Sequence, residues 1–297
     1  MARWALADQV LKDLQEIRNS VERARRATEI IDGNTAVIAA ASAIRQEALE
    51  ELRDRMTHAE IARATGLTRA RVSQLLAGAR PERSLLAPDS GPLTVCVIEK
   101  REAERGRSAI TRTTVAAAGK LAALAAAYDI ALAASGDMPG VEPVPASGLV
   151  DLNRPNLAVL IGPRSSPLVA QAISADPAVR WGPDGNGDWY FTDLRTGQEY
   201  HSDFDRGTDP GKPWPRTCYA HIGRIRRPDG QGSWLCLAGE HAPGVAGAVR
   251  FFCEEITSLW EQARRSLWSA VVEVKAAEDD EIVDALLVTP VYVQSRR

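Results

Sequence analysis

Apolar residues recur in steps of three and four through the first part of the chain, which is the spacing of one face of a helix. The first stripe predicts a helix over about residues 3–31. Asp32-Gly33-Asn34 is expected to end this helix, because Gly33 suits a left-handed position just after a helix. The members of the stripe are Ala7, Val10, Leu14, Ile17, Val21, Ala24, Thr28 and Ile31.

A second helix is expected over about residues 35–56, with an apolar stripe of its own. The two stripes either pack on each other within one chain or form a seam that is shared with a second subunit. The members of the second stripe are Val37, Ala41, Ile44, Ala48 and Leu52.

Residues 57–76 predict two short helices joined by a tight turn. Thr57 and Glu60 form a Thr-x-x-Glu capping box, which starts a helix abruptly. Gly66 is placed to end that helix with a positive φ, and Thr68 is a good N-cap for the next one. With Val72, Leu75 and Leu76 facing inward, the residues expected to point away from the bundle are Thr68, Arg69, Ala70, Ser73, Gln74 and Ala77.

This segment resembles the helix-turn-helix of bacterial regulators, and over residues 36–80 it is most similar to the sigma-factor region 4 type. The resemblance rests on an acidic-Ile-Ala first helix and on Arg-x-x-Val-Ser-Gln-Leu in the second helix. It implies that the second helix enters the major groove of double-stranded DNA, with some side chains at base edges and others at phosphates. The DNA-binding residues that it implies are Thr68, Arg69, Arg71, Ser73, Gln74, Arg80 and Arg83.

A complete sigma factor is not expected, because promoter melting requires an aromatic-rich domain ahead of the motif. Only 56 residues precede the motif here, and Trp4 is their single aromatic residue. The alternative to DNA binding is a helix pair that serves only protein contacts.

Charge is informative locally and not over the whole chain. The 36 basic and 39 acidic residues give a net charge of −3, so the chain as a whole has no electrostatic attraction to nucleic acid. Residues 63–83 nevertheless carry five Arg and one Glu, a local charge of +4. Such a basic segment is what binding to the phosphate backbone requires.

The length and the distribution of proline indicate two domains. At roughly 100–200 residues per domain, 297 residues allow two. Residues 1–80 contain no proline, and residues 81–92 contain three of them, which predicts a linker. The boundaries expected are a helical domain at 1–80 with its helix-turn-helix at 57–78, a linker at 81–92, and a second domain at 93–297.

The sequence of the second domain predicts an α/β architecture. Short β-branched or apolar runs at 93–98, 157–161 and 234–238 read as strands, and each is followed by a helical segment. Short strands separated by Gly, Pro and Asp between residues 179 and 225 suggest an antiparallel insertion, and 269–275 a last strand. The fold class expected is therefore a two-domain α+β and α/β protein: an N-terminal all-α helix-turn-helix bundle and a C-terminal α/β domain with a mixed sheet.

Two strand-to-helix turns hold the candidate ligand-binding residues. In open α/β sheets ligands bind beyond the carboxyl ends of the strands, and the amides at helix N-termini favour anions. Neither turn matches a dinucleotide or P-loop motif, so glycine there can equally reflect turn geometry alone. The candidates for a small anionic ligand are Gly162, Arg164, Ser165, Ser166, Gly239, Glu240, His241 and Gly244.

Other groups with chemical potential have a plainer interpretation. Carboxylates with a histidine suit hydrolysis or a metal, but Asp193, Glu199, His201, Asp203 and Asp205 lie among turn residues and read equally well as solvated loops. The four tryptophans at 181, 189, 214 and 234 suggest core anchors or a stacking wall for a planar ligand. No catalytic residue, metal or cofactor is assigned.

The sequence favours a cytoplasmic chain. No two of the four cysteines lie closer than 17 residues apart, which suggests reduced thiols. The N-terminus has charges every few residues and lacks an apolar secretion segment, and the Ala-rich stretch at 114–134 contains Lys120 and Asp129, so no membrane contact is expected.

The function expected is a cytoplasmic bacterial transcription regulator that binds double-stranded DNA, forms a homodimer and senses a ligand or partner with its second domain. One alternative is a hydrolase that consumes nucleotide or NAD and is targeted by the helix-turn-helix. Another is an assembly module without a ligand.

Overall fold

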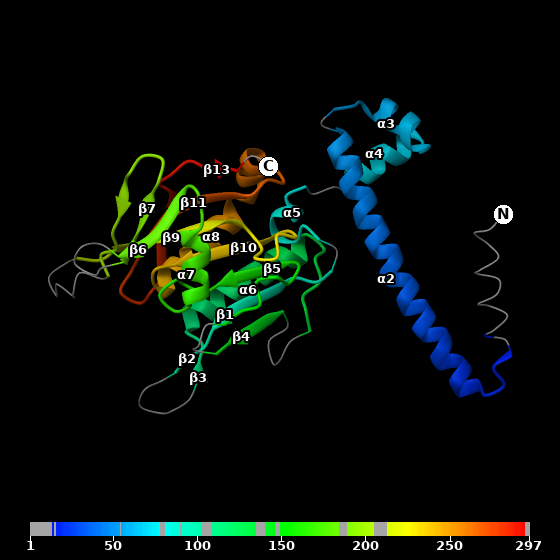
Figure 1. Cartoon of the computed structure of the whole chain (residues 1–297), viewed down its shortest axis with the longest axis horizontal. Coiled ribbons are helices and arrows are strands. Elements are labelled where there is room, and N and C mark those ends of the chain that lie inside the picture. Colours follow the sequence, from blue (N-terminus) through cyan, green and yellow to red (C-terminus); the bar gives the residue numbers. More distant parts are fainter. Residues whose placement is uncertain are drawn as a thin grey trace. The chain divides into compact units, whose positions relative to one another are not determined.

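The computed structural model describes residues 14, 16–53, 55–77, 81–89, 91–101, 108–134, 140–145, 149–183, 189–204 and 213–294. The chain divides into two compact units, residues 1–79 and 80–297, and Figure 1 labels most of their elements. Among the described helices, none combines the length and the apolarity that a membrane crossing requires.

The first unit is helical. Its described helices are α2 (Ser20–Arg53), α3 (His58–Thr65) and α4 (Arg69–Ala77). A small apolar core joins them, built from the fully or nearly buried side chains of Leu49, Ile61, Ala62, Val72 and Leu76. The inward face expected for α4 is thereby confirmed, with Leu75 partly buried against the same core.

The long helix α2 corrects the expected helix boundaries. It runs unbroken for 34 residues through Asp32, Gly33 and Asn34, so the expected helix end at Gly33 is wrong. A glycine inside a helix costs only about 1 kcal/mol relative to alanine, which a long hydrogen-bonded ladder tolerates. The helix begins instead after Asn19, whose side-chain oxygen accepts a hydrogen bond from the Glu22 amide at 3.1 Å. Of the expected seam, Ala7 and Val10 lie outside the described residues.

The second unit contains the mixed sheet that the sequence predicts. In the described part of the chain its strand order is β12-β11-β9-β10-β5-β1-β4, and β13 pairs with β11. Strands β10, β5, β1 and β4 run parallel, whereas β9, β11, β12 and β13 add antiparallel pairs. The bounds are β1 Thr94–Ile98, β4 Val141–Val144, β5 Leu157–Leu160, β9 Arg216–Arg226, β10 Ser233–Gly239, β11 Trp268–Ala276, β12 Ile282–Leu287 and β13 Tyr292–Val293.

Both faces of this sheet are covered (Figure 1). Alternate residues point to opposite faces, so Val95 and Leu160 pack with helices α6 (Arg112–Ala127), α8 (Ala242–Glu254) and α9 (Ile256–Ala263). Cys96 and Val159 pack on the other face with α7 (Pro167–Ser174) and an antiparallel sheet of β6 (Val179–Pro183), β7 (Trp189–Asp193) and β8 (Glu199–Tyr200). A two-stranded ribbon of β2 (Lys100–Arg101) and β3 (Ser108–Ala109) completes the described strands.

The segment expected to be a linker is packed instead. Residues 83–86 form the short helix α5 (Arg83–Leu86), and Leu85, Leu86 and Ala87 are buried in the core of the second unit. Its three prolines suggested an exposed connection, but the apolar run Leu-Leu-Ala between them gains more from burial than from exposure. The described residues from Pro81 onward therefore belong to the second unit.

Candidate functional site

The entry into the α3–α4 pair is fixed by hydrogen bonds within the chain. The Thr57 amide donates to Glu60 Oε2 at 2.8 Å, and the Glu60 amide donates to Thr57 Oγ1 at 3.4 Å, which confirms the expected capping box. Hydrogen bonds from the Thr57 amide and hydroxyl hold the pKa of the Glu60 carboxyl below its ordinary value. The start of α3 is thus set by two residues.

A tight turn of residues 66–68 connects the two helices. Gly66 has a φ of 71°, the left-handed conformation in which a Cβ is unfavourable. Thr68 Oγ1 accepts a hydrogen bond from the Arg71 amide at 3.1 Å and so caps α4, as expected. Leu67, between them, packs on the apolar core of the unit. The angle between α3 and α4 is therefore held by the turn and the core together.

The structure separates the expected DNA-binding residues into groups. Thr68, Arg69 and Arg71 are exposed at the start of α4. Ser73 is partly buried, and its Oγ lies 3.0 Å from His58 Nδ1, so it faces α3 and not away from the bundle as expected. The Gln74 side chain and Arg80 lie outside the described residues. Arg83 lies in α5 of the second unit, so it is not part of the helix pair.

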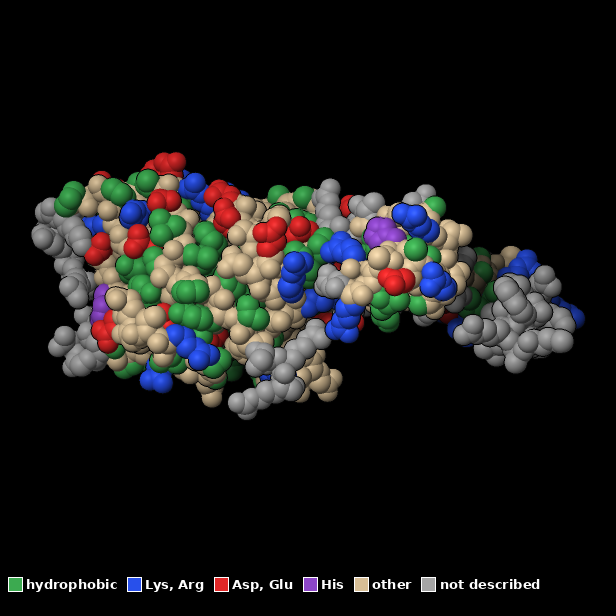
Figure 2. Space-filling model, turned by 90° about the horizontal axis from the view of Figure 1, so that it is seen from above, with side chains coloured by type: hydrophobic (Ala, Val, Ile, Leu, Met, Phe, Trp, Pro, Cys, Tyr) green, Lys and Arg blue, Asp and Glu red, His purple; other side chains and the backbone are tan. Residues whose placement is uncertain are grey.

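The surface of the helix pair is basic. Within residues 55–77 there are four Arg and a single acidic residue, Glu60, whose carboxylate is occupied by Thr57. Figure 2 shows Lys and Arg side chains spread over this part of the molecule. His58, which sequence reasoning left without a role, links α3 to α4 through Ser73. Its position 15 residues before Ser73 gave no local signal of that contact.

The two glycine-bearing turns lie side by side at the carboxyl ends of two neighbouring strands of the main sheet. Strands β5 and β10 are parallel neighbours, with Ala158 opposite Leu235, so the turns that follow them meet as the sequence predicts. A Cβ on Gly162 would lie 2.3 Å from the Gly239 carbonyl oxygen, and one on Gly239 would lie 2.3 Å from the Gly244 carbonyl carbon. These glycines are therefore explained by close backbone approach.

Several of the polar candidates in these turns have structural roles. Ser166 is fully buried, and its Oγ accepts from the Val169 amide at 3.3 Å to cap α7. Glu240 is nearly buried, and its Oε2 accepts from the Tyr219 amide at 3.2 Å, while its own amide donates to the Tyr219 carbonyl. The Ser165 amide closes the turn onto the Gly162 carbonyl at 2.9 Å.

Arg164, Ser165 and His241 are the candidates whose side chains are exposed or partly exposed. Arg164 is exposed, donates to the Trp189 carbonyl at 3.4 Å and lies 5.8 Å from the Trp181 ring. The His241 ring stacks on Phe204 at 5.3 Å, and it makes no side-chain cap at the start of α8. These side chains and the hydroxyl of the partly exposed Ser165 are what remains of the expected anion site.

The carboxylate cluster at 193–205 consists of separate structural contacts. Asp193 accepts hydrogen bonds from the Arg195 amide, the Thr196 hydroxyl and the Tyr292 hydroxyl, which hold a turn. His201 Nε2 lies 3.0 Å from the exposed Glu199, and Asp203 accepts from the Thr217 amide. Asp205 lies outside the described residues. Across the part of the chain that the structure describes, no three His, Cys, Asp or Glu side chains group as metal ligands would.

A buried polar cluster beneath α7 was missed by sequence reasoning. Asp176 Oδ1 accepts from the amides of Ala178 and Val179 and from Ser269 Oγ, and Oδ2 lies 3.5 Å from His221 Nε2. Burial by itself raises the pKa of Asp176, but the neighbouring His221 imidazole and the hydrogen bonds from the two amides bring it below its ordinary value. His221 and Ser269 are fully buried and Asp176 is 5% exposed, so the cluster ties the end of α7 to the strands around it.

The four cysteines are free thiols, of which Cys96, Cys218 and Cys236 are fully buried. Burial raises the pKa of Cys96 to about 12 and that of Cys253 to about 11. Thiols with such values are neutral at ordinary pH and are poor nucleophiles.

Comparison with protein-family models, curated proteins and solved structures found no match for this chain.

Proposed function

We propose that this chain is a DNA-binding transcription regulator that reads duplex DNA with α4 and senses a ligand with its second unit. The observation that carries the proposal is the pairing of a rigidly capped α3–turn–α4 element with exposed basic residues at the start of its second helix. Arg69 and Arg71 project there, while Val72 and Leu76 anchor the opposite face in the core.

This arrangement suits groove recognition. A recognition helix contacts base edges with residues near its N-terminus while the preceding helix crosses the backbone. Arg69 has the planar guanidinium that pairs bidentately with guanine, and Arg71 is placed for a phosphate. With Ser73 turned toward His58, base readout falls chiefly to Arg69 and its neighbours.

Selection of a preferred duplex by the full chain from a random DNA pool, followed by fluorescence polarisation, tests the proposal. Arg69→Ala is expected to weaken the selected site by roughly 1–3 kcal/mol and to relax its base preference. Arg71→Ala is expected to weaken all duplexes alike and to make the dependence on salt shallower.

Arg112→Ala is the matched control, because it removes one exposed positive charge from α6 in the second unit. Its affinity for DNA should equal that of the unmodified chain. Selection of no preferred duplex, or an Arg69→Ala variant with unchanged affinity and base preference, would contradict the groove assignment.

A further inference from the structure

The second unit contains a cavity of about 470 Å³ on the α7 side of the main sheet. Its walls come from the outer side of α7, from the residues that follow α7, and from the end of β9. This volume lies within the roughly 300–1,000 Å³ of small-molecule sites. The residues that matter below are Leu152, Leu168, Gln171, Ala172, Ile225 and Arg226.

The cavity is not the site that the glycine turns suggested. Arg226 pairs with Ser233, the first residue of β10, whereas Gly239 is the last residue of that strand. The cavity therefore lies at the end of the sheet where β10 begins, and the glycine turns lie at the opposite end, where β10 ends. Sequence patterns gave no sign of it, because its walls come from segments that are far apart in the chain.

The walls of the cavity are mostly apolar, and among its described residues they include one arginine side chain that is not paired with a carboxylate. Leu152, Leu168, Ala172 and Ile225 supply hydrocarbon surface. The exposed Arg226 side chain makes no hydrogen bond or ion pair with the residues that the structure describes. A site of this kind favours a molecule with an apolar body and an anionic head.

The other charged residues of the cavity are already paired. Arg227 lies 3.2 Å from Asp229 and 4.0 Å from Asp89. Asp176 directs Oδ1 to two backbone amides and Ser269, and Oδ2 to His221. Among the described residues that line the cavity, Arg226 therefore has the positive charge that is left for a ligand.

We propose that this cavity binds a small amphipathic anion, with its apolar body against Leu168, Ala172 and Ile225 and its carboxylate, sulfonate or phosphate at Arg226. The binding is a property of the second unit. Its role as the signal of the regulator rests on the proposed function.

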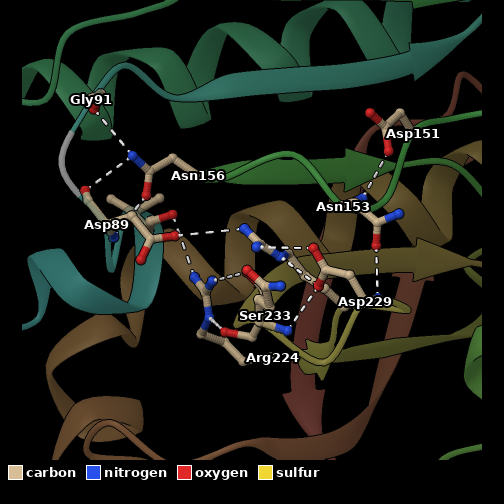
Figure 3. Close-up of polar contacts among 11 residues, drawn as sticks. Asp89, Gly91, Asp151, Asn153, Asn156, Arg224, Asp229 and Ser233 are labelled. Atoms are coloured by element: carbon tan, nitrogen blue, oxygen red, sulfur yellow. Dashed lines mark hydrogen bonds and ion pairs between the residues drawn. The ribbon is translucent and has the colours of Figure 1, made fainter.

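The same end of β9 also anchors the segment that leads to the first unit (Figure 3). Arg224 is buried, and its Nη1 donates to the Leu85 carbonyl at 2.8 Å, next to the C-terminal end of α5. The Asn156 side chain holds the same segment, because it accepts from the Asp89 amide at 2.9 Å and donates to the Gly91 carbonyl at 3.2 Å. Arg227 connects this network to the cavity through Asp89.

A ligand at Arg226 therefore lies beside residues that fix where the second unit begins. Occupancy changes DNA binding only if the ligand has different affinities for the DNA-competent and incompetent states. The Arg227–Asp89 contact is the place where such a difference can arise, since Arg227 lines the cavity and Asp89 belongs to the anchored segment.

Calorimetric titration of the full chain without DNA tests the binding. The probes are decanoate, decanol and decylamine below their aggregation limits, which share an apolar body and differ in head-group charge. Decanoate is expected to saturate one site per chain and to bind about tenfold more tightly than decanol, with decylamine weakest, because charge-assisted hydrogen bonds strengthen only the anion. Equal binding of the three, or no saturable decanoate binding, would overturn the proposal.

Three variants locate the site. Ala172→Trp fills the cavity and should lower decanoate affinity at least tenfold. Gln171→Trp does the same from an exposed position and serves if Ala172→Trp fails to fold. Arg226→Gln should remove the preference for decanoate over decanol, whereas the matched charge change Arg112→Gln on α6 should keep it. Undiminished decanoate binding in a folded tryptophan variant would show that the ligand lies elsewhere.

The signalling role is tested separately by DNA titration with and without saturating decanoate. A change in DNA affinity of about fivefold or more is expected, and it should vanish in Arg226→Gln. Unchanged DNA affinity would overturn the signalling role and leave the DNA-binding proposal standing. Loss of DNA binding in Arg69→Ala with decanoate binding intact would show that the two activities belong to different sites.

Discussion

At the scale of single residues, buried polar side chains of the second unit connect its helices and strands through hydrogen bonds. Arg224 ties β9 to the carbonyl of Leu85, and Asp176 ties the end of α7 to β6, β9 and β11. Buried polar groups with satisfied hydrogen bonds fix a unique arrangement, and they are costly to disrupt. Their titration is thereby linked to stability.

Replacement of Asp176 by Asn should lower the free energy of unfolding by roughly 1.5–3 kcal/mol near neutral pH, because hydrogen bonds to a charged group are lost. The folded pKa of Asp176 lies below the ordinary value of an aspartate, so the stabilisation is fully present above that ordinary value. It disappears as the pH falls through the lower, folded pKa. Urea unfolding of both proteins, from neutral pH down to acid pH below the ordinary pKa of an aspartate, measures the difference.

Asp129→Asn is the control for that comparison, since Asp129 is exposed and has a positive φ of 54° that asparagine also tolerates. Its effect should be small at every pH. A difference between Asp176→Asn and the unmodified chain that grows on acidification would contradict the assignment.

At the scale of elements, the contact between the turns after β5 and β10 depends on the absence of side chains. Gly162→Ala would place a methyl group 2.3 Å from the Gly239 carbonyl oxygen, where only backbone could yield. We expect a loss of about 1–3 kcal/mol of stability from this overpacking. Chemical denaturation of the purified full chain measures it.

Gly119→Ala in α6 is the matched substitution, because an added Cβ there meets nothing within 4 Å. It should raise stability by about 0.5–1 kcal/mol, since alanine is the better helix former. A Gly162→Ala protein as stable as Gly119→Ala would mean that the two turns do not approach as closely as described.

The elements were predicted well where local chemistry decides them. The capping box of Thr57 and Glu60 and the apolar runs of β5 and β10 carry their own signals, and the structure confirms them. The errors came where long-range packing decides. Gly33 is carried within a long helix, and the prolines around Leu85 and Leu86 hid a segment that only the folded sheet could bury.

The candidate sites divide in the same way. Exposure of Arg69 follows from helix periodicity and was foreseen, whereas Arg71, which is also exposed, was expected near DNA only through the family resemblance. The Ser73–His58 contact, the Asp176–His221 pair and the Arg226 cavity depend on which segments the tertiary fold brings together, so no spacing in the sequence could reveal them.

At the scale of the whole molecule, the proposed function calls for two copies. One helix-turn-helix reads few base pairs, and dimers gain affinity by spanning two half-sites about one DNA turn apart. On α2, Ile44 remains 66% exposed although Leu49 of the same helix is buried. Ala41 and Ala48, which flank Ile44 in the expected apolar stripe, are exposed as well, and an exposed apolar stripe along a helix is suited to a contact between subunits.

Light scattering of the full chain at tens of micromolar is expected to give twice the chain mass of 32.1 kDa. Ile44→Asp should shift the mass toward that of one chain, because a buried charge without a partner opposes association. Glu51→Asp, a conservative change at an exposed position of α2, should leave the dimer intact. A monomeric unmodified protein would contradict this prediction. A dimeric Ile44→Asp variant would show that the contact between subunits does not include Ile44.

The burial of α5 also bears on how such units are exchanged during evolution or in the laboratory. A hybrid that joins the second unit to another DNA reader would retain its hydrophobic interior only if the crossover falls before Pro81. A crossover at Gly91 would discard Leu85 and Leu86, and it would leave the Arg224 guanidinium facing an empty apolar recess. In the sequence the proline-rich stretch resembles a domain boundary, but it is the wrong place for recombination. We expect stable hybrids only when the crossover point lies a few residues earlier, before Pro81.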